Sequence, residues 1–279
     1  MARSWPGRCS LCAAAAALAA AAPAAASYRA RTFSFVDRTR ARTLRTIVRY
    51  PTASGRHPLI VFAHGFTLMP GTYSKLLDAW ARAGYVVAAP IFPRTNAHAA
   101  GGPDESDLIN QPRDMSFVIS RLLALSARAG GVLGGMIDPR RIAVAGQSDG
   151  GVTALAVAYD ARFRDRRIRA AVVMSGALLG GMRQFAQRGP PLLAMQGTAD
   201  TINAPASTET YFRLARRPKF LVWLVGAEHL PPYTTEQPQL SVVEGATLAF
   251  LGRYLLGRPL GAFLSAARRP GITKLVSQP

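Results

Sequence analysis

Short apolar runs alternate with amphipathic segments along most of this chain, and this alternation restricts the possible folds strongly. The continuous runs 59–64 (LIVFAH), 85–90 (YVVAAP) and 141–146 (RIAVAG) are typical of parallel strands buried on both faces. Amphipathic segments between them, such as 111–130, predict helices. Strands that alternate with helices indicate an α/β fold, in which helices cover both faces of a mostly parallel sheet.

The same pattern continues towards the C-terminus. We expect further strands at 168–175, 191–197 and 219–226, and helices at 72–84, 150–159, 208–217 and 240–257. The segment 43–50 alternates apolar residues with arginines and threonines, which predicts an exposed edge strand.

A serine between two glycines, Gly146-Gln147-Ser148-Asp149-Gly150, lies where a predicted strand ends and a predicted helix begins. A Gly-x-Ser-x-Gly turn in that context projects the serine above the sheet, and its glycines let the strand and helix pass closely. Glycine-serine turns are also common as plain turns. The flanking strand and helix favour Ser148 as a nucleophile.

A serine hydroxyl needs a base to take its proton and an acid to hold that base. In the chain order nucleophile, acid, histidine, the single histidine after Ser148 is His229, directly after an apolar run. Asp200 follows the predicted strand 191–197 and is the candidate acid. The alternative role for Asp200 is a helix cap, although Ser207 and Thr208 are better placed to cap the next helix.

Two backbone amides are candidates for stabilising an oxyanion. The N–H of Asp149 begins the helix after the serine, and the N–H of Phe66 lies in the loop after the strand 59–64, where Gly65 permits close approach. His64 precedes the serine in sequence. We expect it either to shape this loop or to be an ordinary core histidine.

The segments HPLIVFAHGF, GYVVAAP, GQSDGG, DTINAP and GAEHLPP together resemble the α/β-hydrolase superfamily. The similarity covers roughly 58–256 and is to the dienelactone-hydrolase-like branch, with bacterial cutinases and polyesterases, chlorophyllases and platelet-activating-factor acetylhydrolases. It implies an α/β-hydrolase fold and a Ser-His-Asp esterase. Those enzymes typically have methionine where this chain has Asp149, and they commonly have a disulfide.

The N-terminal 26 residues have the order of a secretory signal. Arg3 and Arg8 precede the apolar run 11–22, and alanines 24–26 form a small-residue cleavage site. A membrane anchor is the alternative, but the run is shorter than the roughly 20 residues that a bilayer span needs. We expect export to the extracellular or periplasmic space, leaving 27–279 as a single catalytic domain. Cys9 and Cys12 would be removed.

The chain is strongly basic, with 34 Lys and Arg against 15 Asp and Glu. Removing Arg3 and Arg8 leaves 32 basic residues against 15 acidic ones, a charge of +17. The arginines are scattered without a recognition motif or interleaved aromatics, which disfavours a specific nucleic-acid partner. We expect a monomer that associates non-specifically with anionic cell envelopes.

Two long links bear on the substrate. Residues 177–190 are too few for a large cap domain, so we expect an open site; Leu178, Leu179 and Met182 either line an acyl groove or pack on the core. A loop at 94–114 contains His98, Asp104, Glu105 and Asp107. Its acids either bind a cation or, as we expect, belong to a solvated loop and lie at a helix start.

These observations predict a secreted esterase that uses neither a cofactor nor a metal and acts on small-molecule or polymeric esters. A serine peptidase or an acyltransferase could use the same residues. A non-catalytic hydrolase-fold binding protein at the cell surface is the alternative from another class.

Overall fold

The computed structural model describes residue 1 and residues 27–182, 184–186 and 189–279 of the 279-residue chain. Residues 2–26, most of the predicted export signal and both cysteines, lie outside the described part. Within that part, no helix is long and apolar enough to cross a membrane.

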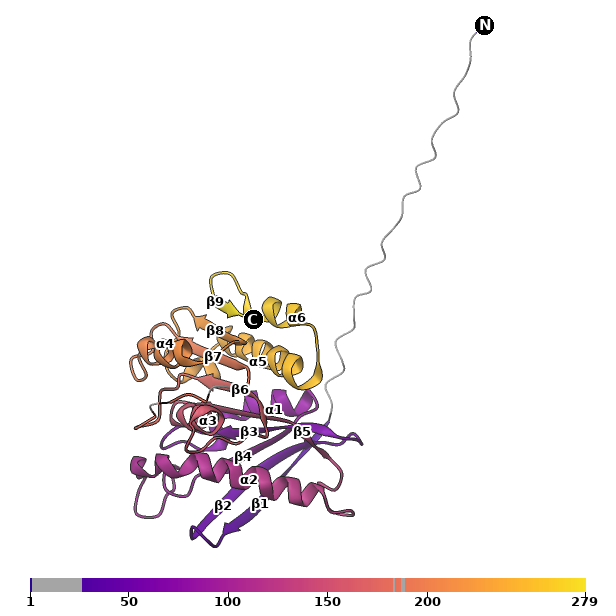
Figure 1. Ribbon diagram of the computed structural model, residues 1–279, viewed down its shortest axis with the longest axis vertical. Coiled ribbons are helices and arrows are strands. Elements are labelled where there is room, and N and C mark those ends of the chain that lie inside the picture. The colour runs from indigo at the N-terminus through magenta and orange to yellow at the C-terminus, as the bar shows by residue number, and fades with distance from the viewer. Residues whose placement is uncertain (2–26, 183, 187–188) are drawn as a thin grey trace.

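A sheet crosses the whole described region, and its nine strands lie in the order β1-β2-β4-β3-β5-β6-β7-β8-β9. Figure 1 shows this order running from the indigo N-terminal hairpin to the yellow C-terminal strand. The strands are β1 (Tyr28–Asp37), β2 (Arg42–Pro51), β3 (His57–Ala63), β4 (Val86–Ile91), β5 (Ile137–Gln147), β6 (Ile168–Met174), β7 (Leu192–Gly197), β8 (Lys219–Leu224) and β9 (Thr273–Gln278).

The strands from β3 to β8 are parallel to one another, and β1, β2 and β9 add antiparallel pairs at the two ends. Helices lie between most consecutive strands from β3 onwards, except between β6 and β7, where the described residues of the link contain no helix. The helices are α1 (Ser74–Arg82), α2 (Gln111–Ser126), α3 (Asp149–Tyr159), α4 (Pro205–Leu214), α5 (Gln239–Leu256) and α6 (Leu260–Ala267), with short 3-10 turns η1 (Pro70–Tyr73), η2 (Glu105–Asn110) and η3 (Pro231–Tyr233).

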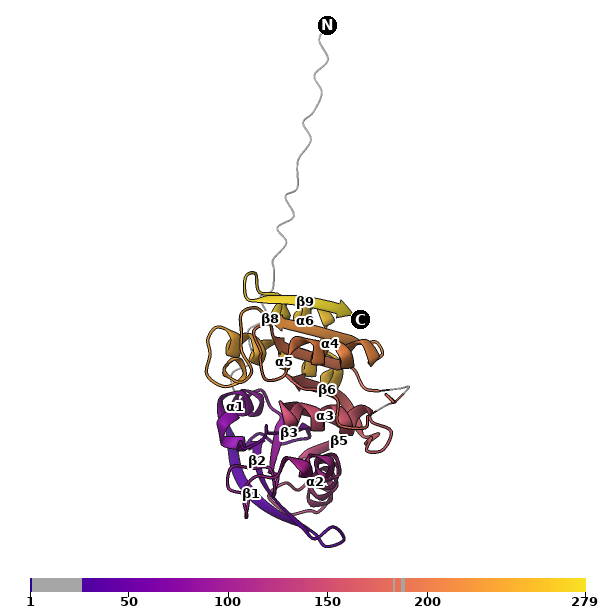
Figure 2. The same ribbon diagram turned by 90° about the vertical axis from the view of Figure 1, so that its left-hand side faces the viewer.

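Both faces of the parallel part of the sheet are buried, which explains why strands such as β3, β4 and β7 are continuous apolar runs. Along β3, Val61 and Ala63 belong to the core shared with α2 and α3, whereas Ile60 and Phe62 belong to the core shared with α1 and α5. Figure 2 shows α1 and α2 on opposite sides of the strands. The predicted α/β-hydrolase architecture is confirmed.

The ends of the sheet differ from the sequence prediction. The strand predicted at 43–50 is not an edge, because β2 pairs with both β1 and β4. Of its three arginines, Arg45 is exposed, whereas Arg42 and Arg49 are buried and each about 8 % exposed. An alternation of arginine with apolar residues suggested a solvent-facing strand, but ion pairs to Asp107, Asp114 and Asp78 allow these arginines to lie inside. The strands β1 and β9 and helix α6 were not predicted.

Candidate active site

Ser148 lies in a sharp turn between the end of β5 and the start of α3. Its backbone has φ 58° and ψ −125°, a conformation that non-glycine residues rarely adopt and that costs energy. The turn is held by neighbouring backbone, because the Ser148 N–H donates to the Met174 carbonyl at 3.0 Å. A strained serine at the carboxyl end of a central strand is the feature that the Gly-x-Ser-x-Gly pattern predicted.

The flanking glycines are required by close backbone contacts. A Cβ atom on Gly146 would lie 2.0 Å from the Gly150 carbonyl oxygen, and one on Gly150 would lie 1.9 Å from the Ala63 carbonyl oxygen. Both distances are far below any van der Waals contact. The start of α3 therefore packs directly on the end of β3, which brings Ser148 next to the loop that begins at His64.

Ser148, His229 and Asp200 form a continuous chain of hydrogen bonds. His229 Nε2 lies 2.8 Å from Ser148 Oγ, and His229 Nδ1 lies 2.8 Å from Asp200 Oδ2. An ionised carboxylate can only accept, so the proton lies on Nδ1 and Nε2 is left to accept from the serine. The three residues come from the ends of β5, β7 and β8, which are far apart in sequence and meet at one edge of the sheet.

Asp200 is kept ionised by several donors. Burial alone would raise its pKa, but hydrogen bonds from His229, Ser175 and the Asn203 N–H outweigh burial and hold the pKa below its ordinary value. Gln196 Nε2 adds a donor to Oδ2 at 2.9 Å, and the Ile202 N–H donates to Oδ1 at 3.0 Å. Because Asp200 is negatively charged and fixed on several sides, it can orient His229 and stabilise its protonated form.

Asp200 does not cap the following helix. The helix α4 begins at Pro205, its N-cap residue is Ala204, and no side chain caps it. Ser207 and Thr208, which the sequence suggested as caps, therefore lie inside the helix.

The loop after β3 lies against the serine turn. The Phe66 N–H makes no hydrogen bond to any described residue, and the Asp149 N–H is one of the first-turn donors of α3 that lack a partner within the helix. Thr67 has φ 57°, and its N–H donates to the Thr95 carbonyl at 2.8 Å, which fixes the loop against the segment after β4. The structure therefore leaves the two N–H groups that the sequence suggested as oxyanion donors, those of Phe66 and Asp149, in adjoining segments.

His64 is both a core residue and an anchor of this loop. It is 1 % exposed, and its Nε2 accepts the Phe92 N–H at 3.1 Å. Because Nε2 accepts, Nδ1 carries the proton and donates to the Gly65 carbonyl at 2.8 Å. Burial lowers the His64 pKa to about 4, against a smaller opposing effect of the Gly65 hydrogen bond. His64 is therefore neutral near pH 7 and is occupied away from Ser148.

The Asp149 side chain is half-buried beside the nucleophile candidate. Its Oδ2 is buried and has no hydrogen-bond partner among the residues described. Burial, helped by the nearby Glu105 carboxylate and opposed by His229, raises the Asp149 pKa to about 6. A carboxyl group that titrates close to neutral pH thus lies next to one of the candidate oxyanion amides.

The acids of the loop at 94–114 lie at a helix start, as the sequence suggested, since Asp104 is the N-cap of η2 and Glu105 and Asp107 are in its first turn. They are not all solvated, however. Asp107 is 4 % exposed and receives two hydrogen bonds of 2.7 Å from Arg42. Asp104 caps η2 and pairs with Arg94, while Glu105 is exposed. Outside the gaps at 2–26, 183 and 187–188, no group of three or more His, Cys, Asp or Glu is placed to hold a metal.

The link between β6 and β7 packs on the core. Leu179 and Met182 are 5 % and 8 % exposed and belong to the core next to α3, with Leu178 against it. The described residues of this link contain no helix. The packing role therefore accounts for these apolar side chains.

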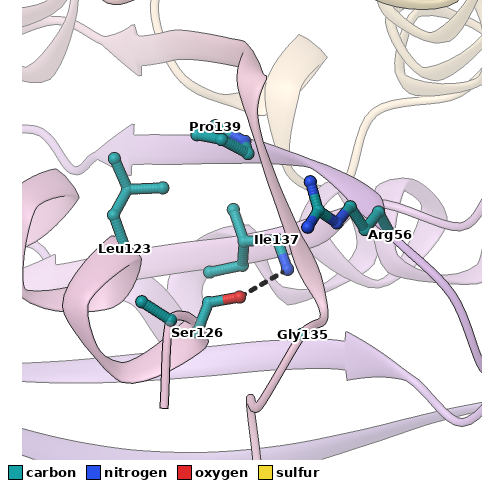
Figure 3. Close-up of a pocket in the computed structure, with 7 residues that line it drawn as sticks. Arg56, Leu123, Ser126, Gly135, Ile137 and Pro139 are labelled. Atoms are coloured by element: carbon teal, nitrogen blue, oxygen red, sulfur yellow. Dashed lines mark hydrogen bonds between the residues drawn. The ribbon is translucent and has the colours of Figure 1, made fainter. Parts of the chain in front are cut away.

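A separate hollow lies at the amino-terminal end of β5, opposite the end that carries Ser148. Figure 3 shows Arg56, Leu123, Ser126 and Ile137 around it. The Ser126 hydroxyl is already occupied by the Ile137 N–H, which donates to it at 2.8 Å. Its lining residues include one arginine and no carboxylate or histidine, so the hollow has no group that could activate the Ser126 hydroxyl as a nucleophile.

The sheet order, the helices on both faces and the strained serine turn together define a hydrolase of the α/β-hydrolase superfamily. The chlorophyllase family model matches residues 28–208, which is more than half of the chain, and the chain belongs to this family. Family membership indicates an ester hydrolase. The matched range contains Ser148 and Asp200 and ends before His229. A search of curated proteins finds no match to the chain.

Proposed function

We propose that the chain is an exported serine esterase in which Ser148 is the nucleophile, His229 the general base and Asp200 the residue that orients His229. The observation that supports this most directly is the pair of 2.8 Å contacts that His229 makes, one to Ser148 and one to Asp200. Both are at the distance at which a proton can be transferred.

The proposed reaction has two halves. Ser148 Oγ attacks the ester carbonyl carbon while His229 Nε2 takes the hydroxyl proton, and the tetrahedral intermediate then expels the alcohol, which receives that proton. Water is next deprotonated by His229 and attacks the acyl-serine, which releases the carboxylic acid and restores Ser148. Asp200 remains ionised throughout and stabilises the imidazolium.

The Phe66 and Asp149 amides stabilise the oxyanion of both tetrahedral intermediates in this proposal. Support comes from the unpaired Phe66 N–H and from the contact of α3 with the end of β3. Pre-oriented donors of this kind contribute roughly 10²–10³-fold to kcat each.

Either the acyl or the alcohol portion of the ester would lie in a hollow beside the loop after β3. Met69, Ile91 and Pro93 give it an apolar floor, and Arg45 and His98 lie on its exposed rim. An open hollow of this composition suits short or bulky esters, including the ends of a polymer. Residues 1–26 would be removed on export, and 27–279 would form one catalytic domain.

The test is the turnover of p-nitrophenyl esters of graded chain length by residues 27–279. Ser148→Ala should lower kcat by at least about 10³-fold, and Asp200→Asn by about 10³–10⁴-fold because the histidine loses its correct tautomer. Ser265→Ala, an exposed serine on α6, is the matched control and should leave kcat unchanged.

The outcomes separate the alternatives. No turnover of any ester by the wild type would contradict the esterase proposal and favour the non-catalytic binding protein. Activity that survives Ser148→Ala would place the chemistry elsewhere. Peptide substrates and added acceptor alcohols, tested next, would identify a peptidase or an acyltransferase.

A further inference from the structure

The side chain of Gln147, the residue before Ser148, makes two buried hydrogen bonds that the proposed reaction does not use. Its Nε2 donates to the backbone carbonyl of His229 at 2.9 Å. Its Oε1 accepts from the Tyr73 hydroxyl at 2.7 Å. Gln147 and Tyr73 are both fully buried, so water does not compete for these bonds.

Tyr73 extends this hydrogen-bond network to the oxyanion loop, the segment after β3 that contains Gly65 and Phe66. Its hydroxyl oxygen accepts the Gly65 N–H at 3.2 Å. The directions are fixed by chemistry, because the His229 carbonyl can only accept and must face the amide nitrogen of Gln147. The other end of the amide is then an acceptor, which takes the single hydroxyl proton of Tyr73 and leaves its lone pair for Gly65.

This hydrogen-bond network therefore joins three loops that follow different strands and meet near Ser148. Gly65 directly precedes Phe66, and Gln147 directly precedes Ser148. The last hydrogen bond of the network is to the backbone carbonyl of His229 itself. Space is also tight, since a Cβ atom on Gly65 would lie 3.2 Å from both Gln147 Oε1 and Tyr73 Oη.

We propose that Gln147 and Tyr73 are positioning residues, which hold the oxyanion loop and the His229 backbone in register with Ser148. This inference rests on the esterase function proposed above. Neither side chain touches the reacting atoms. Each acts on kcat by fixing where the Phe66 N–H and the imidazole lie when the tetrahedral intermediate forms.

The expected fall in kcat follows from what each hydrogen bond holds in place. Loss of one link leaves a buried donor or acceptor without a partner, and the loop then moves to satisfy it. A displacement of about 1 Å at a reacting centre can lower a rate by about 10²-fold. Ground-state binding of the ester, which depends on the open hollow, should change little.

Tyr73→Phe removes the hydroxyl and keeps the ring. We expect kcat for p-nitrophenyl esters to fall roughly 10–100-fold, with KM changed less than about threefold. Affinity for a boronic acid, which forms a tetrahedral adduct on the serine, should fall with kcat.

Gln147→Glu gives a second readout through its pH profile. A carboxylate at this position can accept from Tyr73, but it cannot donate to the His229 carbonyl and instead repels it. When protonated it donates again. The ratio of variant to wild-type kcat should therefore rise as the pH falls through the pKa of the introduced carboxyl group, which burial raises. A residue that only filled space would give a ratio independent of pH.

The matched control is Thr247→Val. Thr247 accepts from Trp80 Nε1 at 2.9 Å in an equally buried hydrogen bond between α1 and α5. We expect a similar loss of stability, measured by urea unfolding, and an unchanged kcat.

The inference is overturned if folded Tyr73→Phe keeps kcat within about threefold of the wild type, if the Gln147→Glu ratio does not change with pH, or if Thr247→Val lowers kcat as much as Tyr73→Phe. Ser148→Ala separates this failure from failure of the proposed function. If Ser148→Ala abolishes turnover while the Tyr73 and Gln147 variants do not lower it, only the positioning role is wrong.

Discussion

Asp149 departs from the resemblance described for the sequence, in which a methionine typically follows the serine. Its amide has a proposed role, whereas its carboxyl group has a buried, unpartnered Oδ2 and a pKa raised to about 6 by burial and by Glu105, with His229 opposing. An ionised carboxylate without a donor is costly in such surroundings. Near neutral pH, this residue should therefore lower the stability of the folded chain.

The sign of the effect follows from the direction of the pKa shift. Because the pKa in the folded chain, about 6, exceeds the ordinary value of 3.8, the folded state binds this proton more tightly than the unfolded state. Stability is thus retained below about pH 4 and is lost as the pH rises to about 6. Relative to wild type, Asp149→Asn should gain about 1–3 kcal/mol in unfolding free energy between pH 4 and pH 8. Urea unfolding of both proteins at several pH values measures this gain, and a pH-independent difference would contradict it.

Sequence signals singled out three residues that the structure joins by hydrogen bonds. Ser148 has a five-residue motif with a strand before it and a helix after it, and His229 and Asp200 follow from chain order. Gln147 lies within that motif, yet its partner Tyr73 is 74 residues away. No spacing rule connects the two, because the bond depends on the orientation of side chains after the sheet has formed.

Among the elements, the hairpin of β1 and β2 is attached to η2 and α2 by buried charges. Arg42 donates to both Asp107 and Asp114, which are 4 % and 0 % exposed, and Arg40 also reaches Asp114. Such a cluster stabilises the fold only while it is complete, since each charge has lost its water.

Arg42→Met should therefore destabilise the chain by about 3–5 kcal/mol, because it leaves two buried carboxylates with less compensation. The Arg42 guanidinium opposes the rise that burial causes in the Asp114 pKa, so its removal raises that pKa further, and the loss should be larger at pH 8 than at pH 5. Thermal and urea unfolding at both pH values test this. Arg94→Met is the control: its pair with Asp104 is 61 % and 36 % exposed, and such pairs contribute less than about 1 kcal/mol. Equal losses in the two variants would contradict the prediction.

The parallel strands and their helices were predictable because burial on both faces leaves an apolar run in the sequence. The ends of the sheet were not. Strand β9 is half-exposed along its length and follows α6 closely, so its pattern is weak. In β2, the arginines suggested exposure, although Arg42 and Arg49 are buried by carboxylates that lie 29 to 72 residues further along the chain. Ion pairs of this kind become visible only once the elements have been placed.

On the scale of the whole molecule, the positive charge of the arginines greatly exceeds the negative charge of the acidic residues that are not already in ion pairs. The chain has 34 Lys and Arg against 15 Asp and Glu, and much of the acid is already paired. The carboxylates that pair with arginine are Asp37, Asp78, Asp104, Asp107, Asp114, Asp138, Asp160 and Asp165. Little negative charge therefore remains to offset the surface arginines.

This charge predicts attraction to anionic surfaces without a specific partner. Residues 27–279 should sediment with vesicles that contain phosphatidylglycerol and should not sediment with pure phosphatidylcholine. Binding should fall steeply between 20 and 500 mM NaCl, because the screening length shortens from more than about 10 Å to only a few Å. Ser148→Ala should bind equally well, since the attraction comes from the whole surface and not from the site. Binding that resists salt, or equal binding to neutral vesicles, would instead indicate a specific or apolar contact.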